Sequence, residues 1–228
     1  MATHSEDRLP HKTAIDPVAL EQFLENLETT LYERGFRSIC GVDEAGRGPL
    51  AGPVVAAAVI LPLDVEIEGL DDSKKLSPAK RDDVFEQIIQ LELPCAVGIV
   101  DHKTIDTVNI LRASLYAMRK AVHDLKPAPD VVLVDGNISI PNLSQPQFTV
   151  VGGDRRCRAI SAASVVAKVT RDRIMVRYQE LYPGFSFATH KGYPTAEHME
   201  ELRRLGPCDI HRRTFRPVAE LINQYALF

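Results

Sequence analysis

Long apolar segments are missing from this sequence: no run approaches the roughly 18 residues that a membrane span requires. It also contains no H-E-x-x-H motif and no G-x-x-x-x-G-K-[ST] loop, so a zinc site of that kind and a small-molecule kinase or phosphatase lack support. Residues 1–10 are polar and include Glu6 and Asp7, unlike a secretory signal or an acid-poor transit peptide. We therefore expect a cytoplasmic protein that does not bind membranes.

Cysteines are few and widely separated. The four cysteines lie more than 40 residues apart and form no C-x-x-C pair, which argues against a cysteine-based zinc site. A disulfide framework fits a reducing compartment poorly. We interpret these residues as small apolar side chains: Cys40, Cys95, Cys157 and Cys208.

A net positive charge is also lacking, because the chain carries −4 overall. The charge is unevenly distributed: residues 151–228 hold 13 Lys/Arg against 8 Asp/Glu, whereas residues 1–150 hold 14 against 23. This asymmetry favours a basic surface in the C-terminal third, although a solvated helix face would give the same balance.

The 228 residues, 45% of them hydrophobic, are enough for one globular domain with a substantial core. Asp16-Pro17 predicts the start of an amphipathic helix that ends at Gly35. Apolar steps of three and four residues from Ile105 to Leu125 predict one long helix. Further helices are expected at 78–91, 158–182 and from about 195, and strands at 37–44, 52–61, 94–101, 130–135 and 148–151.

This order of strands and helices predicts an α/β fold with a mixed sheet flanked by helices. Three regions are expected: an N-terminal extension with one amphipathic helix (1–36), a catalytic domain (37–184) and a small C-terminal helical lobe (185–228).

Acidic residues follow two of the predicted strands. Asp135 ends the most apolar one, and ligands bind at the carboxyl ends of central strands in α/β sheets. Alternatively, Asp135 caps the turn at Gly136-Asn137. Asp43 and Glu44 end the first strand together, and both can face one side only if the backbone turns there; otherwise they lie on the surface.

Asp172 falls on a mostly apolar face of its predicted helix. A buried carboxylate must be neutralised, paired or bound to metal. Lys168, four residues earlier, offers an ion pair as the alternative to a metal. Crowded carboxylates suit Mg²⁺ or Mn²⁺, and two such ions can position an attacking water and a leaving oxygen on a phosphorus. The spacing alone does not show that these carboxylates meet.

Six ordered blocks between about residues 37 and 217 resemble bacterial ribonuclease HII, the type 2 ribonuclease H family. The position before His211 is Ile210, where relatives commonly have serine. The blocks are GVDEAGRGPLAGPVV (41–55), DSKKLS (72–77), VDGN (134–137), SAASVVAKVTRD (161–172), HKGYPT (190–195) and HRRTF (211–215).

The resemblance implies a ribonuclease H-like fold and an endonuclease that hydrolyses RNA in RNA–DNA hybrids, or cuts 5′ of a single ribonucleotide in duplex DNA, leaving 3′-hydroxyl and 5′-phosphate ends. Its role would be ribonucleotide removal and hybrid turnover, and we expect a monomer. It implies further that two Mg²⁺ or Mn²⁺ ions are held by Asp43, Glu44, Asp135 and Asp172.

The same resemblance implies substrate contacts. The segment Gly46-Arg47-Gly48 would read the ribose 2′-hydroxyl, since glycine lets the backbone approach closely. Tyr193 would pack on the sugar beside the junction, although alone it would suggest a core aromatic. Ser73 and Lys74 would contact phosphates. The candidate duplex contacts, each weak alone, are Arg155, Arg156, Arg171, Arg212 and Arg213.

Two rival functions remain open. Another nuclease or recombinase of the same fold would share the carboxylates but lack Gly46-Arg47-Gly48 and Tyr193 in these contexts. A non-catalytic hybrid-binding module would tolerate loss of a metal ligand.

Overall fold

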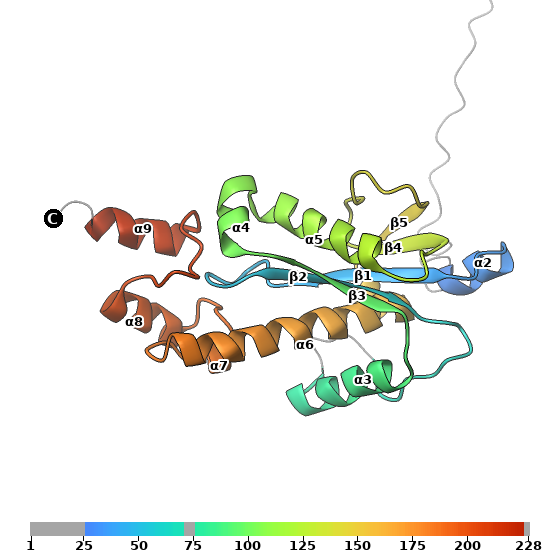
Figure 1. The fold of residues 1–228 in the computed structure, drawn as a ribbon, viewed down its shortest axis with the longest axis horizontal. Helices are drawn as coiled ribbons and strands as arrows, with labels where there is room; N and C mark the ends of the chain where they lie inside the picture. Colours follow the sequence, from blue (N-terminus) through green and yellow to red (C-terminus); the bar gives the residue numbers. More distant parts are fainter. Residues whose placement is uncertain (1–25, 71–75, 226–228) are drawn as a thin grey trace, which may run out of the picture.

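The computed structural model describes residues 26–70 and 76–225, and in this part of the chain it shows one mixed five-stranded sheet in the order β3-β2-β1-β4-β5 (Figure 1). Strands β1, β2 and β3 pair antiparallel, and β1, β4 and β5 pair parallel. The strand bounds are Ile39–Ala45 (β1), Val54–Ile60 (β2), Cys95–Val100 (β3), Val131–Asp135 (β4) and Gln147–Val150 (β5).

The register of β1 and β4 brings their carboxyl ends together. Val42 pairs with Val134 in this parallel ladder. Asp43 and Asp135, the next residue of each strand, therefore lie beside each other at the same end of the sheet. All seven residues of β2 are buried, since helices cover both faces. The predicted α/β fold with a mixed sheet is therefore confirmed.

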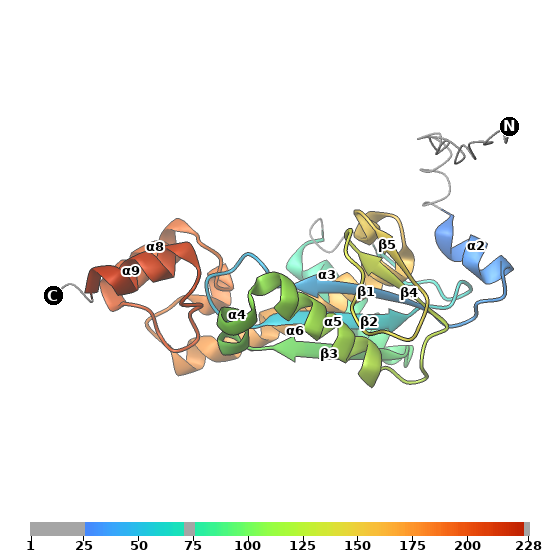
Figure 2. The ribbon, with the colours of Figure 1, turned by 90° about the horizontal axis from the view of Figure 1, so that it is seen from above.

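Helices lie on both sides of the sheet (Figures 1 and 2). Helices α4 and α5 cover one face, whereas α6 and α3 cover the other. The helix bounds are Leu27–Glu33 (α2), Pro78–Gln90 (α3), His102–Val108 (α4), Ile110–Asp124 (α5), Arg158–Leu181 (α6), Phe187–His190 (α7), Ala196–Leu205 (α8) and Arg216–Tyr225 (α9), with a short 3₁₀ turn at Gly153–Arg155.

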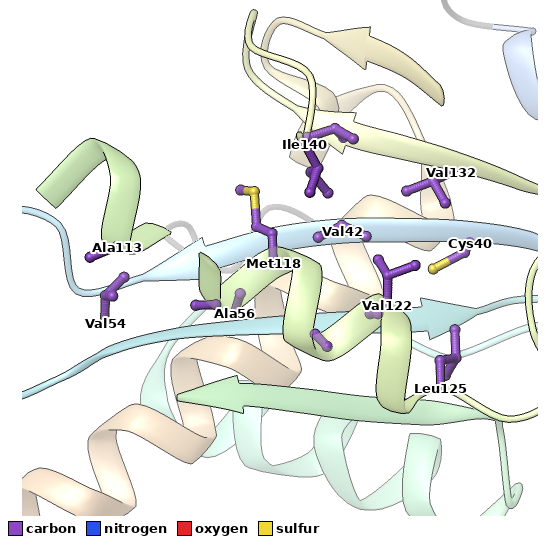
Figure 3. Packing of buried hydrophobic residues seen from close by; sticks show 14 of the residues in the cluster. Cys40, Val42, Val54, Ala56, Ala113, Met118, Val122, Leu125, Val132 and Ile140 are labelled. Carbon is purple, nitrogen blue, oxygen red and sulfur yellow. The ribbon is translucent and has the colours of Figure 1, made fainter. Parts of the chain in front are cut away.

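The two faces of the sheet carry separate apolar cores. Figure 3 shows the core under α5, where Met118 and Val122 meet Val42 and Ala56. The opposite core packs α6 and α3 onto the other face of β2. Gly41 allows α6 to approach β1 closely, because a Cβ at this position would lie 2.1 Å from the carbonyl carbon of Ala159. This contact sets the first turn of α6 against β1, and Ser164, further along the helix, reaches Asp43 near the carboxyl end of the strand.

The C-terminal helices extend the molecule at the end away from α2 (Figures 1 and 2). Their core includes Phe187 and Leu202 together with Leu50 from the loop between β1 and β2 and Met175 from α6. Backbone hydrogen bonds join the same parts, with the Leu50 N–H donating to the Gly192 carbonyl at 2.7 Å. The C-terminal segment is therefore built onto the β1–β2 loop. The division into regions 1–36, 37–184 and 185–228 stays a prediction.

Two predicted helices differ from the structure. The long helix expected from Ile105 to Leu125 is wrong in its continuity: α4 and α5 meet at Asn109, whose φ of +71° breaks the helix while its side chain accepts from Arg112 N at 3.1 Å. The helix expected from about Thr195 begins there, since Thr195 is the N-cap of α8, but it ends at Leu205 and α9 follows separately.

The helix predicted near the N-terminus falls partly outside the described residues. Its predicted start at Asp16-Pro17 lies outside the described residues, and α2 covers Leu27–Glu33. Within the described ranges, no helix is both long and apolar enough to cross a membrane.

Candidate active site

Three predicted carboxylates share one pocket at the carboxyl ends of β1 and β4. The pocket has a volume of about 320 Å³, and Asp43, Glu44 and Asp135 all line it. Both Asp43 and Glu44 line it, although the regular pairing of β1 with β2 continues to Ala45, so the expected backbone turn does not fall at these two residues. The other lining residues are Ala45, Gly46, Arg47, Gly48, Ser164, Lys168 and Tyr193.

Asp43 is the most buried of these acids, with 4% of its surface exposed. Burial raises its pKa well above the usual value, and the negative charges of Glu44 and Asp135 raise it further. A hydrogen bond from the Ser164 hydroxyl and one from the Glu44 N–H, at 2.7 Å, act in the opposite direction. Asp43 therefore lies in a crowded acidic site that a cation would stabilise.

Asp135 and Glu44 are held by local contacts. The Gly153 N–H donates to Asp135 Oδ1 at 2.7 Å, which ties the end of β4 to the 3₁₀ turn. Gly153 packs closely there, since an added Cβ would lie 2.5 Å from Ile160 Cδ1 and 3.3 Å from Asp135 Oδ1. Glu44 pairs with Arg47 at 3.1 Å, and the Arg47 side chain is 54% exposed.

Asp172 faces a neighbouring pocket of about 620 Å³. Lys168 Nζ lies 2.8 Å from its Oδ1, and Arg81 Nη1 lies 3.9 Å from its Oδ2. The ion pair considered as the alternative is thus formed in this structure. Lys168 lines the carboxylate pocket itself, so it stands between Asp172 and the other three acids. The role of Asp172 as a metal ligand stays a prediction.

The donor set of the pocket suits a hard divalent cation. Carboxylate oxygens are the ligands that Mg²⁺ and Mn²⁺ prefer, and a bound cation would offset the burial and the charge repulsion that together raise the pKa of Asp43. Within residues 26–70 and 76–225, no three His, Cys, Asp or Glu side chains are already placed to hold a metal together.

Two buried arginines hold the loop Gly46-Arg47-Gly48 and the residues after it. Arg212 donates to the carbonyls of Gly46 at 2.6 Å and Arg47 at 3.0 Å, and also to those of Gly52 and Pro53. Gly46 has a φ of +103°, and an added Cβ would lie 2.2 Å from Arg171 Nε. Glycine is therefore required where Arg171 crosses the loop.

The expectation that Arg171 and Arg212 contact a duplex is wrong, because both side chains are fully buried. Arg171 donates instead to the carbonyls of Ala51, Pro53 and Lys191. Burial lowers the pKa of Arg171 to about 10 and that of Arg212 to about 9, so both remain charged at neutral pH. The duplex roles of Arg155, Arg156 and Arg213 remain predictions.

Tyr193 reaches the carboxylate pocket from the C-terminal segment and is 38% exposed. Lys168 Nζ lies 5.7 Å from its ring centre and Arg171 Cζ lies 5.9 Å from it. Its position beside Gly48 is compatible with the predicted sugar contact, which stays a prediction. Ser73 and Lys74, the predicted phosphate contacts, lie outside the described residues.

Two buried, hydrogen-bonded histidines, His198 and His211, lie behind the backbone of Tyr193 and form what we call the histidine relay. The sequence did not predict it. The Cys208 N–H donates to His211 Nδ1 at 3.0 Å, so the proton of a neutral His211 is on Nε2. That Nε2 donates to His198 Nε2 at 3.0 Å, which leaves His198 Nδ1 to donate to the Tyr193 carbonyl at 2.9 Å. Burial lowers the pKa of His198 to about 4 and that of His211 to about 3. Both rings are therefore neutral near pH 7.

Sequence comparisons identify relatives over most of the chain. A family model described as Ribonuclease HII matches residues 40–218. Ribonuclease HII of Geobacter sulfurreducens is 54% identical over 199 residues, which are 87% of this chain and 91% of that protein. Ribonuclease HII of Listeria innocua is 50% identical over 198 residues, which are 86% of this chain and 75% of that protein.

Solved structures agree with this assignment. The ribonuclease H2 from Pyrococcus horikoshii OT3 matches with a TM-score of 0.68 at 27% identity, covering 83% of this chain and 99% of that one. Bst-RNase HIII in complex with Mn²⁺ has a TM-score of 0.63 at 16% identity, and the match covers 96% of this chain and 77% of that one. At this identity the match supports the fold alone. The ribonuclease H-like fold and the resemblance are both confirmed. This chain belongs to the ribonuclease HII family of ribonuclease H nucleases.

Proposed function

We propose that this ribonuclease H hydrolyses the RNA strand of RNA–DNA hybrids and cuts duplex DNA on the 5′ side of a single embedded ribonucleotide, leaving 3′-hydroxyl and 5′-phosphate ends. One observation carries the proposal: the parallel register of β1 and β4 brings Asp43, Glu44 and Asp135 to a pocket that also contains the Gly46–Gly48 loop and Tyr193. Acid groups for cations and a surface for a sugar therefore lie side by side.

The carboxylates would act by holding cations. Asp43, Glu44, Asp135 and Asp172 would together bind two Mg²⁺ or Mn²⁺ ions, which when bound neutralise the reacting phosphate and supply an activated water. Asp43 and Asp135 are fixed by backbone N–H donors before substrate binds. Asp172 would join them by leaving Lys168, and the freed ammonium group, which already lines the pocket, would then face the substrate phosphates.

Recognition of ribose would rest on a rigid loop. The Gly46 and Arg47 carbonyls are engaged by Arg212, which fixes the peptide planes of the loop in advance. A Cβ added at Gly48 would have only Tyr193 within 4 Å, at 3.7 Å, so the backbone there can be approached closely. A loop held in this way can contact a 2′-hydroxyl without an ordering cost at the moment of binding.

The C-terminal residues 185–228 would form the substrate-binding lobe, because they present Tyr193 to the pocket and hold it through the contact between His198 and the Tyr193 carbonyl. Ser73 and Lys74 would contact phosphates. We propose further that the protein acts as a cytoplasmic monomer in ribonucleotide removal and hybrid turnover during DNA replication and repair.

The test uses three labelled duplexes: an RNA–DNA hybrid, a DNA duplex with one ribonucleotide, and the same duplex without it. Each is incubated with Mg²⁺, Mn²⁺ or a chelator, and the product ends are mapped. We expect cleavage of the first two only, a cut on the 5′ side of the ribonucleotide, and no reaction with chelator. Equal cleavage of the all-DNA duplex would favour another nuclease of the same fold.

A further inference from the structure

A second, smaller pocket adjoins the carboxylate pocket. Its volume is about 60 Å³, and it shares Glu44, Arg47 and Asp135 with the first. Its far side is formed by helix α5 and by the turn Gly136–Ile138 after β4. Tyr193 and Gly48 line only the first pocket, so a strand lying over the shared carboxylates would enter both.

One stripe of α5 forms the wall of this second pocket. Leu111, Ser114, Leu115 and Met118 all line it, and their spacing of three and four residues places them on one helix face. Leu111 is 38% exposed and Ile138, opposite, is 41% exposed, whereas Ser114 is only 2% exposed. The apolar side chains therefore form a rim above a deep hydroxyl group.

The Ser114 hydroxyl is unusual because it has no hydrogen-bond partner within the described residues. Buried polar groups in folded proteins nearly always have a partner, and one that lacks it needs an explanation. Ser114 is the only pocket-lining residue among the described side chains with such an orphan atom, since the other, His102 Nε2, lines neither pocket. The missing partner is therefore expected to come from a ligand.

The chemistry of the pocket selects the kind of ligand. Its walls combine the carbon atoms of Leu111, Leu115 and Ile138 with the neutral hydroxyl of Ser114 and the amide of Asn137, and its mouth carries the carboxylates of Glu44 and Asp135. A phosphate would be repelled there, since Arg47 is the only cation in the lining and already pairs with Glu44. A sugar edge, neutral and with both carbon and hydroxyl groups, fits these walls.

We propose that this second pocket receives the sugar edge of the nucleotide on the 5′ side of the scissile phosphate, and that Ser114 bonds to its 2′-hydroxyl when that sugar is ribose. The inference rests on the proposed function, which places the ribonucleotide read by Gly46–Gly48 in the first pocket and its 5′ neighbour beyond the shared carboxylates. Contact requires the Leu111 and Ile138 rim to open, because the Ser114 oxygen is covered in the structure.

Ser114 would thus favour continuous RNA over an isolated ribonucleotide. The test compares three duplexes that all contain the ribonucleotide on the 3′ side of the cut. They differ only in the sugar of the nucleotide on its 5′ side, which is deoxyribose, ribose or 2′-fluoro-deoxyribose. The 2′-fluoro sugar keeps an RNA-like pucker but has no hydroxyl. Only the cut between this nucleotide and the following ribonucleotide is counted, and kcat/KM is measured for each duplex.

For the unmodified enzyme we expect ribose to be preferred over deoxyribose by about 3- to 10-fold, the range of one hydrogen bond, and the fluoro sugar to behave as deoxyribose. Ser114→Ala should bring the ribose preference close to 1. Ser139→Ala, at an exposed serine in the turn after β4 that does not line the pocket, should keep the preference of the unmodified enzyme.

Three results would overturn the inference while leaving the proposed function intact: no ribose preference in the unmodified enzyme, an undiminished preference in Ser114→Ala, or a fluoro sugar that equals ribose. If none of the three duplexes were cleaved, the proposed function would be overturned instead, and this inference with it. Thermal melting of both serine variants checks that they are folded.

Discussion

The acidic strand ends and the C-terminal segment meet at one pocket but are held in place by different physical means. Asp43 and Asp135 are fixed by the register of β1 and β4 and by backbone N–H donors. Tyr193 and the Gly46–Gly48 loop are fixed by buried polar side chains, Arg212 and His198 among them. The sheet thus supplies the reactive groups, and a hydrogen-bonded network supplies the surface around them.

This difference means that damage to the two regions should look different in experiment. Changes to the strand-end carboxylates should remove activity with little effect on folding, because the charges there repel one another. Changes to the network should cost stability first, because they leave buried polar groups without partners.

The largest effect is expected at the strand ends. Asp135→Asn should lower the cleavage rate by about 1000-fold or more, because several kcal/mol of cation-mediated stabilisation would be lost. Hybrid affinity, measured by fluorescence anisotropy with chelator present, should change little. Asp64→Asn, at an exposed acid outside the pocket, is the control. Retained turnover in Asp135→Asn would refute the assigned role and favour the binding-module interpretation.

In the network, Arg212→Met should lower the free energy of unfolding by about 3 kcal/mol or more, since several buried carbonyls lose a charged donor. Urea denaturation measures the loss. The neighbouring Arg213→Met removes an exposed side chain and should stay within about 0.5 kcal/mol of the parent protein. Equal stability of the two variants would show that the loop is held by other contacts.

The histidine relay should make stability fall in acid. Both His198 and His211 have folded-state pKa values below the ordinary 6.5, so the unfolded chain takes up protons first as the pH falls. The stabilisation is full above pH 6.5 and declines towards pH 4 for His198 and towards pH 3 for His211, by about 2 kcal/mol for each histidine at pH 5.

Denaturation at pH 7 and pH 5 tests this dependence. His198→Gln should have a smaller loss between the two pH values than the parent protein, despite a lower stability at pH 7. His123→Gln changes an exposed histidine on α5 and should leave the loss unchanged. An identical pH dependence in all three proteins would contradict the neutral relay.

The smallest effect is expected at the Tyr193 hydroxyl. If the ring packs on a sugar, Tyr193→Phe should keep kcat/KM within about 3-fold on a one-ribonucleotide duplex, whereas Tyr193→Ala should lose about 10-fold or more, the value of one stacking contact. Steady-state cleavage assays measure both. Equal losses in the two variants would assign the function of Tyr193 to its hydroxyl instead.

The same contrast explains what the sequence could reveal. An apolar run that ends in an acid predicts a buried strand and its functional end, and Asp135 lies where this pattern placed it. The break at Asn109 was missed because a positive φ interrupts an otherwise regular apolar period. The sequence does not reveal that Arg171 and Arg212 are buried, because it does not show which polar groups bind backbone carbonyls.

Asp172 marks the limit of such prediction within the site. Its apolar helix face was recognised, yet the same face allows an ion pair with Lys168 or a shared cation, and the structure shows the ion pair. Periodicity predicts on which side of a helix a residue lies, but it does not predict which partner the side chain binds.

The proposed mechanism requires that Asp43, Glu44, Asp135 and Asp172 share divalent cations. A crystal structure with Mn²⁺ and a non-cleavable hybrid, in which anomalous scattering locates the metal, tests this requirement most directly. We expect Mn²⁺ bound between Asp43 and Asp135, with Asp172 turned away from Lys168 to join them. Manganese bound elsewhere, or an Asp172 that keeps its 2.8 Å contact with Lys168 in the loaded complex, would contradict it.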